Sequence, residues 1–324
     1  MTDGQNHSAL RLQLVFRECG NAARPVARRW SDCVCGDPES RHGIILAKNE
    51  KAKAFGVQTA ETIWQAKRKC PDLRLVAPHR SEYVKFSRKC NELYLQYTDL
   101  VDPFGIDESF LDVTGSMHLF GSGEHIADEL RRRMREEVGL TISVGVSFNR
   151  AFAKLGSDYK KPDGTTVFSR EFQAARVVLA REHAPVCRQR ASDRLNRLGV
   201  RTIGELAACD PAFIHSILGK NGDLLLRYAR GEDDEPVRSF YAEREVKSVG
   251  NSIRSRNNLL GADECRMGIT ALCDNVGRRL RKRGMVCQTV QLGIRDPEFH
   301  NRSRQVTLER PTNSTRALID LSMP

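Results

Sequence analysis

The chain has no long apolar run, and this absence excludes a protein built around membrane-spanning helices. None of its 324 residues falls in a stretch approaching the roughly 18 apolar residues that a bilayer-spanning helix needs. The first residues, MTDGQNHSAL, also lack the basic stretch followed by an apolar one that marks a secretory leader. We therefore expect a cytoplasmic protein with no membrane partner.

Clustered cysteines are also lacking. The ten cysteines are dispersed along the chain, and only Cys33 and Cys35 lie close together. A single Cys-x-Cys without a second cluster argues against both a disulfide scaffold and a structural zinc site. We expect reduced, partly buried thiols.

Negative charge is in short supply. Lys and Arg total 52 against 41 Asp and Glu, which gives a net charge of +11, and residues 247–324 hold 14 basic against 7 acidic residues. Such an excess favours a polyanionic partner such as nucleic acid, with a merely basic surface as the alternative. Hydrophobic residues at 40% and charged residues at 29% indicate a globular chain, long enough for several domains.

The hydrophobic pattern alternates between strand and helix periods in the first half of the chain. Tyr83, Phe86, Cys90, Leu93 and Tyr94 recur at helical spacing within 81–97. This alternation predicts a mixed α/β layer. The expected strands are 44–47, 104–113 and 140–148, and the expected helices end near Phe55, contain Trp64, and cover 81–97 and 122–138.

The second half has a different organisation. Residues 191–231 predict several short helices interrupted by glycines, and the acidic stretch 231–236 with the residues after it is expected to be a linker. Beyond it the pattern predicts a strand from 247, a helix over 264–283, two strands and the start of a helix. Basic side chains on one face of the first strand can follow a DNA backbone. They are Lys247, Arg254 and Arg256.

Two adjacent carboxylates carry the clearest chemical signal. Asp107 and Glu108 lie inside GIDESFLDVTGS. At a strand end both side chains can turn toward one ion, and paired hard oxygen ligands suit Mg²⁺. Taken alone, such a pair is more often a solvated turn, so the surrounding motifs decide between the two interpretations.

Those motifs resemble a known family. GIDESFLDVTGS, followed by SVGVSFNRAFAKLGSDYKKPDGTTVF, is similar to the Y-family (UmuC-domain) translesion DNA polymerases. The resemblance extends from 36–73 through both motifs to 195–237 and 247–252, in one order. It implies an α+β / α/β multidomain fold shaped as a right hand. The palm would be a ferredoxin-like sheet, the fingers small and α/β, the thumb a helical helix-hairpin-helix unit, and the little finger α/β and incomplete.

The same resemblance implies domain boundaries. They are an aberrant N-terminal segment at 1–35, fingers at 36–79, palm at 80–169, thumb at 170–236, a linker at 237–246 and a truncated little finger at 247–324.

The resemblance implies a template-directed DNA polymerase that performs low-fidelity translesion synthesis. Its partners would be primer-template DNA and dNTPs. Asp107 and Glu108 would be two of three carboxylates that hold two Mg²⁺ ions, and Lys161 would contact the incoming triphosphate. A sliding clamp is expected for the family, although no clamp motif is present in this chain, and a monomer is expected.

Three further candidate site residues, Lys53, Gly199 and Thr202, lie in segments that match the family. Lys53 stands where the family has an Arg on the triphosphate, while Glu50 replaces a Tyr in NEKAKAFGV. A lysine supplies charge without the bidentate fork of arginine. In LNRLGVRTIGEL, Gly199 and Thr202 are expected at a hairpin whose backbone N–H groups face a DNA phosphate.

The chain departs from this family at its start. A strand like D-x-N-S-F-F-A-S-V-E, which carries the third metal ligand and the steric gate against ribonucleotides, is absent from 1–35. With permitted codons, LRLQLVFRECG at 10–20 reads one base later as C-D-C-N-S-F-F-A-S-V-E. Residues 179–190 similarly read as W-P-A-S-M-L-L-Y-V-G-N, and the last little-finger strand is missing. We infer that the chain is the translation either of a frame-disrupted polymerase gene or of an imperfect nucleotide sequence.

Two alternatives remain beside an active polymerase. The first is a catalytically impaired DNA-binding remnant of such a polymerase, which would bind DNA without incorporating nucleotides. The second is an unrelated Mg²⁺ nucleotidyltransferase or cyclase with a similar palm sheet. It is disfavoured because GVRTIGEL and the basic C-terminal quarter would have no use in it.

Overall fold

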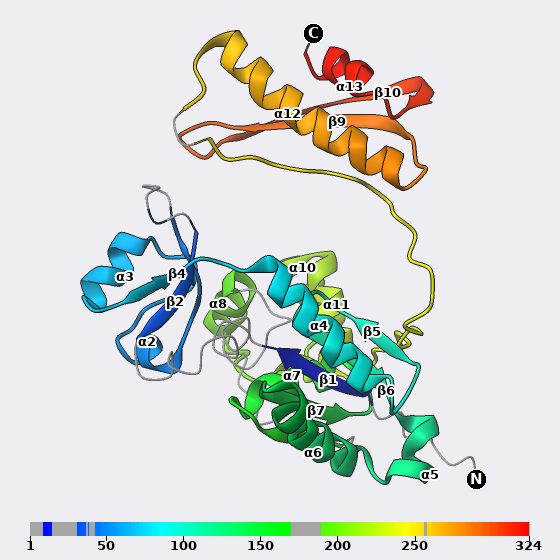
Figure 1. Ribbon diagram of the computed structural model, residues 1–324. Helices are drawn as coiled ribbons and strands as arrows, with labels where there is room; N and C mark the ends of the chain where they lie inside the picture. The colour runs from blue at the N-terminus through cyan, green and yellow to red at the C-terminus, as the bar shows by residue number, and fades with distance from the viewer. Residues whose placement is uncertain are drawn as a thin grey trace. The chain divides into compact units, whose positions relative to one another are not determined.

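A computed structural model describes residues 9–14, 31–36, 38, 43–169, 189–255 and 258–323. The chain divides into two compact units, 1–242 and 243–324 (Figure 1). Residues 179–188, which are most of the second window expected to be out of frame (179–190), and Arg256 lie outside the described residues.

A five-stranded sheet forms the centre of the first unit, in the order β5-β6-β1-β7-β8. β1 pairs antiparallel with both β6 and β7, while β7 and β8 are parallel. The N-terminal segment that departs from the family thus supplies the central strand of this sheet. The strands are β1 (Ala9–Leu14), β5 (Val101–Pro103), β6 (Glu108–Asp112), β7 (Ile142–Ser147) and β8 (Thr165–Phe168).

Helices lie on both faces of this sheet. α4 (Arg80–Tyr94) confirms the expected amphipathic helix, and with α6 (Gly123–Arg133) it forms a core against alternate residues of β6 and β7. α6 continues as a π-helical turn, η3 (Met134–Val138), which ends at Gly139. Since neighbouring strand residues point to opposite faces, Gly145 faces the other side, where α7 (Arg150–Tyr159) packs. Short helices η2 (Thr114–Ser116) and α5 (Met117–Phe120) connect β6 to α6.

The approach of α7 to β7 depends on Gly145. A Cβ at this position would lie 1.9 Å from the carbonyl oxygen of Ala153 and 2.5 Å from the backbone nitrogen of Ser157. Only glycine therefore lets the backbone of α7 lie directly on the strand. This contact fixes α7 across β7, where it also packs against β1 and β8.

We expect Gly145→Ala to lower the free energy of unfolding of the first unit by about 3 kcal/mol, because the new methyl overlaps backbone atoms that cannot rotate away. Urea unfolding measures the change. Gly115→Ala is the control in the same unit, since a Cβ at that position meets no atom within 4 Å. Equal losses in the two variants would contradict this account of the α7 contact.

A second, three-stranded sheet has the order β3-β2-β4. It begins at Asp32, four residues before the expected start of the fingers at 36. Thr62 and Gln65 form a capping box that begins the second helix of this subdomain. The elements are β2 (Asp32–Cys35), β3 (Ile45–Lys48), α2 (Glu50–Ala54), α3 (Ile63–Lys69) and β4 (Arg74–Val76).

The expected reduced thiols are confirmed in this subdomain. Cys33, Cys35 and Cys70 are unpaired and buried in its core. Burial, with the neighbouring Cys35, Asp32 and Cys70 groups, raises the pKa of Cys33 to about 12. These side chains act as small apolar groups at neutral pH.

Between 189 and 242 the described chain forms four helices, as the pattern of short helices interrupted by glycines predicted. They pack with Phe152 and Leu155 of α7 in a shared core. The helices are α8 (Gln189–Arg197), α9 (Ile203–Ala208), α10 (Pro211–Leu218) and α11 (Lys220–Ala229).

The acidic segment 231–236 was expected to be part of a linker, and that expectation is wrong. The Asp233 carboxylate accepts a hydrogen bond from the Ala151 N–H at 3.0 Å, and Glu235 pairs with Arg150 at 3.1 Å. The Gly231 carbonyl accepts from Asn149 at 3.1 Å. Acidic groups are stabilised at a helix N-terminus, so this segment docks on the first turn of α7.

The second unit contains α12 (Gly261–Lys282), β9 (Cys287–Arg295), β10 (Asn301–Thr312) and α13 (Thr315–Ser322). The helix, two strands and second helix confirm the sequence pattern from 261 onward. With the first unit, they confirm the α+β fold class. No helix in the described ranges combines the length and apolarity needed to cross a bilayer.

The strand expected from 247 is not formed, and the prediction is wrong. Residues 246–255 are irregular, and the described sheet of this unit contains β9 and β10 alone. A strand needs a partner for its N–H and C=O groups. Gly250 instead accepts a hydrogen bond from Arg279 of α12 at 2.7 Å, so side-chain contacts to this helix replace a sheet ladder.

Candidate functional site

The Asp107–Glu108 pair lies where the turn after β5 enters β6. Asp107 is the last residue of the turn, Glu108 is the first residue of the strand, and both are partly buried. This is the strand-end position at which neighbouring carboxylates can face one ion. The side chain of Glu108 is 12% exposed, so its charge requires a partner.

Lys154 of α7 is that partner. Its Nζ lies 2.7 Å from Oε1 of Glu108 and 3.0 Å from Oδ2 of Asp158, one helical turn along α7. Lys161, just beyond the helix, pairs with the other oxygen of Asp158. Four groups of alternating charge therefore connect the first residue of β6 to Lys161.

This chain of charges includes two residues that sequence analysis missed. Asp107, Glu108 and Lys161 were expected at the site, whereas Lys154 and Asp158 were not. Their i, i+4 spacing inside a helix whose neighbouring residues are mostly apolar was the available signal. Charged side chains at such positions are rare unless paired.

The carboxylate oxygens of Asp107 and Glu108 are ligands of the kind that suits Mg²⁺. The family resemblance implies three such carboxylates, and these two are the ones that the described residues place here. Among the described residues, the one group of three or more ligand atoms within 4.8 Å of one another is Asp296, Glu298 and His300 in the second unit, not at Asp107 and Glu108. In the backbone register of the central sheet, Gln13 of β1 stands opposite Glu108. The strand that borders the pair therefore has a glutamine, and not an acidic residue, at the position paired with Glu108.

Lys53 lies on α2 in the three-stranded subdomain. Its Nζ is 3.9 Å from Glu50 on the same helix, and both side chains are largely exposed. Such an exposed pair contributes little to stability, so Lys53 is accessible to an anion from solvent.

The hairpin between α8 and α9 contains Gly199 and Thr202. Gly199 has a φ of +86°, which favours glycine, and the Thr202 hydroxyl caps α9 by accepting from the Glu205 N–H. The N–H groups of Arg201 and Thr202 donate to the Glu205 carboxylate at 2.7 and 2.9 Å. These hydrogen bonds, that from Arg201 first, lower the pKa of Glu205. This turn thus already accommodates an anionic group.

The basic residues of the second unit are exposed. Lys247 and Arg254 lie on the irregular segment before α12.

Comparison with known proteins decides the family. Models described as the impB/mucB/samB family and its C-terminal domain match residues 16–158 and 246–324. A DNA polymerase IV of Acetivibrio thermocellus is 44% identical over 90% of this chain and 73% of its own length. The chain belongs to the Y-family DNA polymerases.

Other relatives agree with this assignment. A DNA polymerase IV of Clostridium acetobutylicum is 32% identical over 90% of this chain and 73% of its length. The DNA polymerase IV 2 of Bacillus subtilis is 32% identical over 94% of this chain and 76% of its length. A solved Y-family DNA polymerase chimera has the same fold, with a TM-score of 0.84 and 20% identity over 97% of this chain and 92% of that one. The family resemblance seen in the sequence is confirmed.

Proposed function

We propose that this chain descends from a template-directed polymerase that transfers a nucleotide from a dNTP to a primer 3′-hydroxyl during low-fidelity translesion synthesis. The observation that carries the proposal is the row of charges Glu108, Lys154, Asp158 and Lys161 beside Asp107. The row begins at the carboxylates of Asp107 and Glu108, which suit cations. It ends at Lys161, whose positive charge suits a triphosphate.

In this proposal Asp107 and Glu108 hold the two Mg²⁺ ions of the family. When bound, such ions neutralise the triphosphate and stabilise the attacking and leaving oxygens of an in-line displacement. The chain's own groups act around that centre. Lys154 orients the Glu108 carboxylate, and Lys161 exchanges its contact with Asp158 for a phosphate oxygen of the nucleotide. Lys53 supplies a second positive charge to the triphosphate.

The DNA contacts are proposed to be independent of base sequence. The hairpin with Gly199 and Thr202 would face a backbone phosphate. That phosphate would replace the Glu205 carboxylate as the acceptor of the hydrogen bonds that the hairpin N–H groups donate. Lys247, Arg254 and Arg256 would follow the backbone from the second unit. Phosphate contacts fix the position of a protein on DNA without reading its sequence.

The small number of carboxylates among the described residues at this site favours a second function. With Gln13 opposite Glu108 and no third carboxylate joining the pair among the described residues, the chain as written would bind primer-template DNA and extend it poorly. It would then act as a DNA-binding remnant of a polymerase.

Salt-dependent binding tests both versions of the function. We expect the chain to bind fluorescent primer-template DNA, with log K falling linearly as log salt rises. Lys247→Ala and Arg254→Ala together should reduce the slope by about two. Arg132→Ala is the matched control, because Arg132 of α6 pairs with Glu136 of η3 and is not proposed to contact DNA. Failure to bind duplex DNA even at low salt would overturn the proposal.

A further inference from the structure

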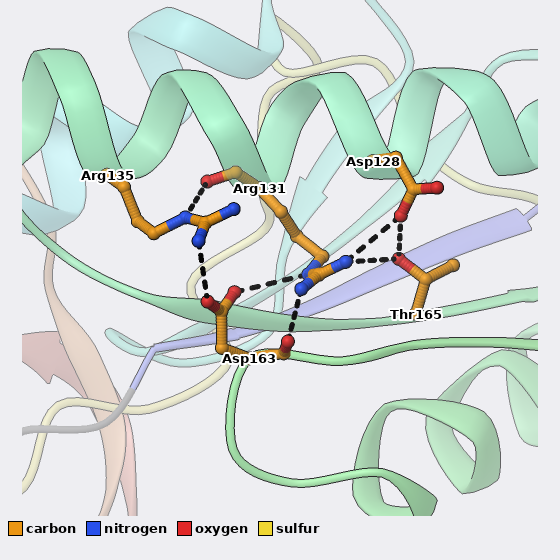
Figure 2. A network of polar contacts seen from close by, with 5 residues as sticks. All are labelled: Asp128, Arg131, Arg135, Asp163 and Thr165. Atoms are coloured by element: carbon orange, nitrogen blue, oxygen red, sulfur yellow. Dashed lines mark hydrogen bonds and ion pairs between the residues drawn. The ribbon is translucent and has the colours of Figure 1, made fainter.

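The turn that carries Lys161 is held from a distant helix. Lys161 lies between the end of α7 at Tyr159 and the start of β8 at Thr165. Arg131 of α6 reaches this turn from 30 or more residues earlier in the chain and contacts Asp163 and Thr165 (Figure 2). The contacts fall two and four residues after Lys161.

Arg131 serves four acceptors that lie in different directions. Its Nε is 3.1 Å from Oδ1 of Asp163, and one terminal nitrogen donates to the Asp163 carbonyl. The other terminal nitrogen lies 3.0 Å from Oδ1 of Asp128 and 3.3 Å from the Thr165 hydroxyl. The rigid fork of a guanidinium matches this arrangement, whereas a lysine ammonium cannot donate to all four positions.

The carboxylate of Asp163 is also held by Arg135. That side chain lies 3.3 Å from the second Asp163 oxygen, so both carboxylate oxygens are occupied by arginines of adjoining helical turns. Asp163 and Arg131 are 21% and 18% exposed, which makes this pair stronger than a surface ion pair. Asp128 completes the network by accepting from the Thr165 hydroxyl at 2.6 Å.

The backbone at Asp163 explains why such a network is needed. Its φ is +54°, a left-handed conformation that costs a non-glycine residue energy. Such a conformation persists only where the surrounding structure imposes it. The next residue, Gly164, has no room for a side chain, because a Cβ there would lie 2.3 Å from the Lys160 carbonyl oxygen. The turn is therefore both tight and strained, and Arg131 holds its strained residue by side chain and carbonyl together.

We propose that Arg131 is a positioning residue for Lys161, acting through Asp163 on the turn between α7 and β8. The inference rests on the proposed function, in which Lys161 contacts the nucleotide triphosphate. Asp158 fixes the ammonium end of Lys161, and Arg131 fixes the backbone end. Loss of Arg131 would let Lys161 leave the row of charges that begins at Glu108.

The first test measures the turn itself. Hydrogen exchange of the peptide covering 159–165 should be about 10-fold faster in Arg131→Lys and in Asp163→Asn, because each removes charge-assisted hydrogen bonds at a partly buried site. Exchange in β7 should not change, which shows that the sheet is intact. Arg132→Lys is the matched control, since Arg132 is the next residue in the chain but pairs with Glu136 instead of with the turn. Unchanged exchange at 159–165 would overturn the proposal whatever the chain's function.

The second test measures whether the effect passes through Lys161. The full chain is bound to primer-template DNA with a dideoxy-terminated primer, and the affinity for dTTP opposite adenine is measured. We expect Lys161→Ala, Arg131→Lys and Asp163→Asn each to weaken binding about 10-fold. The double variant of Arg131→Lys and Lys161→Ala should be no weaker than Lys161→Ala alone.

Each outcome has a separate meaning. Additive losses in the double variant, or unchanged dTTP affinity in Lys161→Ala, would overturn the positioning role. Absence of dTTP binding by the unsubstituted chain on DNA would contradict the proposed function, and the exchange data would still decide whether Arg131 orders the turn.

Discussion

Replacing residues 10–20 with C-D-C-N-S-F-F-A-S-V-E raises Mg²⁺-dependent primer extension by at least about 100-fold, because the third carboxylate then aligns the reacting groups. The position of β1 supports this expectation. This strand lies between β6 and β7, and its backbone pairs with the strand that begins at Glu108. The replaced segment would put its Asp at position 11, two residues before the β1 position that pairs with Glu108 in the backbone register. The measurement is single-turnover extension of a labelled primer by the two chains.

A matched control isolates the carboxylate from the rest of the replaced segment. The same replacement with its one Asp changed to Asn, C-N-C-N-S-F-F-A-S-V-E, should fold equally well and extend no faster than the chain as written. Robust extension by the chain as written would contradict this prediction, because two carboxylates would then suffice.

In the chain with the replaced segment, Asp107→Asn and Glu108→Gln are each expected to lower the rate of extension about 1,000-fold. Both substitutions keep the shape of the side chain and remove a negative charge that would hold metal. Primer-template affinity should change less than twofold, since neither residue is proposed to contact the DNA backbone. The rate is measured by rapid-quench extension and the affinity by fluorescence anisotropy.

Glu136→Gln is the control for removing a carboxylate from the same unit. Glu136 is exposed and pairs with Arg132, so its neutralisation should leave the rate unchanged. Thermal unfolding of Glu108→Gln is measured in parallel, because Lys154 loses a charged partner there. If Asp107→Asn and Glu108→Gln extend primers as fast as the parent chain, the pair is not the catalytic centre.

Local sequence patterns predicted the parts of the fold that local contacts determine. The amphipathic spacing from Tyr83 to Tyr94 is realised in α4, and the apolar run 140–148 contains β7. The strand expected from 247 failed because alternation alone does not provide a pairing partner. The acidic segment 231–236 appeared to be a linker because its partner, the N-terminus of α7, lies 80 residues earlier in the chain.

The candidate site was predictable only in part for the same reason. The motif around Asp107 and Glu108 and the KKPDG segment with Lys161 were recognisable from their order in the sequence. Lys154 joins these motifs through space, and nothing in the order of residues shows that α7 passes beside the start of β6. The contact of Arg131 with Asp163 spans 32 residues and two elements. Such contacts depend on tertiary packing, which Gly145 permits by its lack of a side chain.

We infer that the codons of residues 10–20, read one base later, encode the catalytic strand of a Y-family polymerase. Determining the nucleotide sequence of codons 10–20 tests it most directly. We expect the next frame to read C-D-C-N-S-F-F-A-S-V-E, which requires an Arg11 codon ending in GA followed by a Leu12 codon ending in TG. Codons whose next frame lacks the Asp and the paired Phe would contradict it, and the N-terminal segment would then be native to this protein.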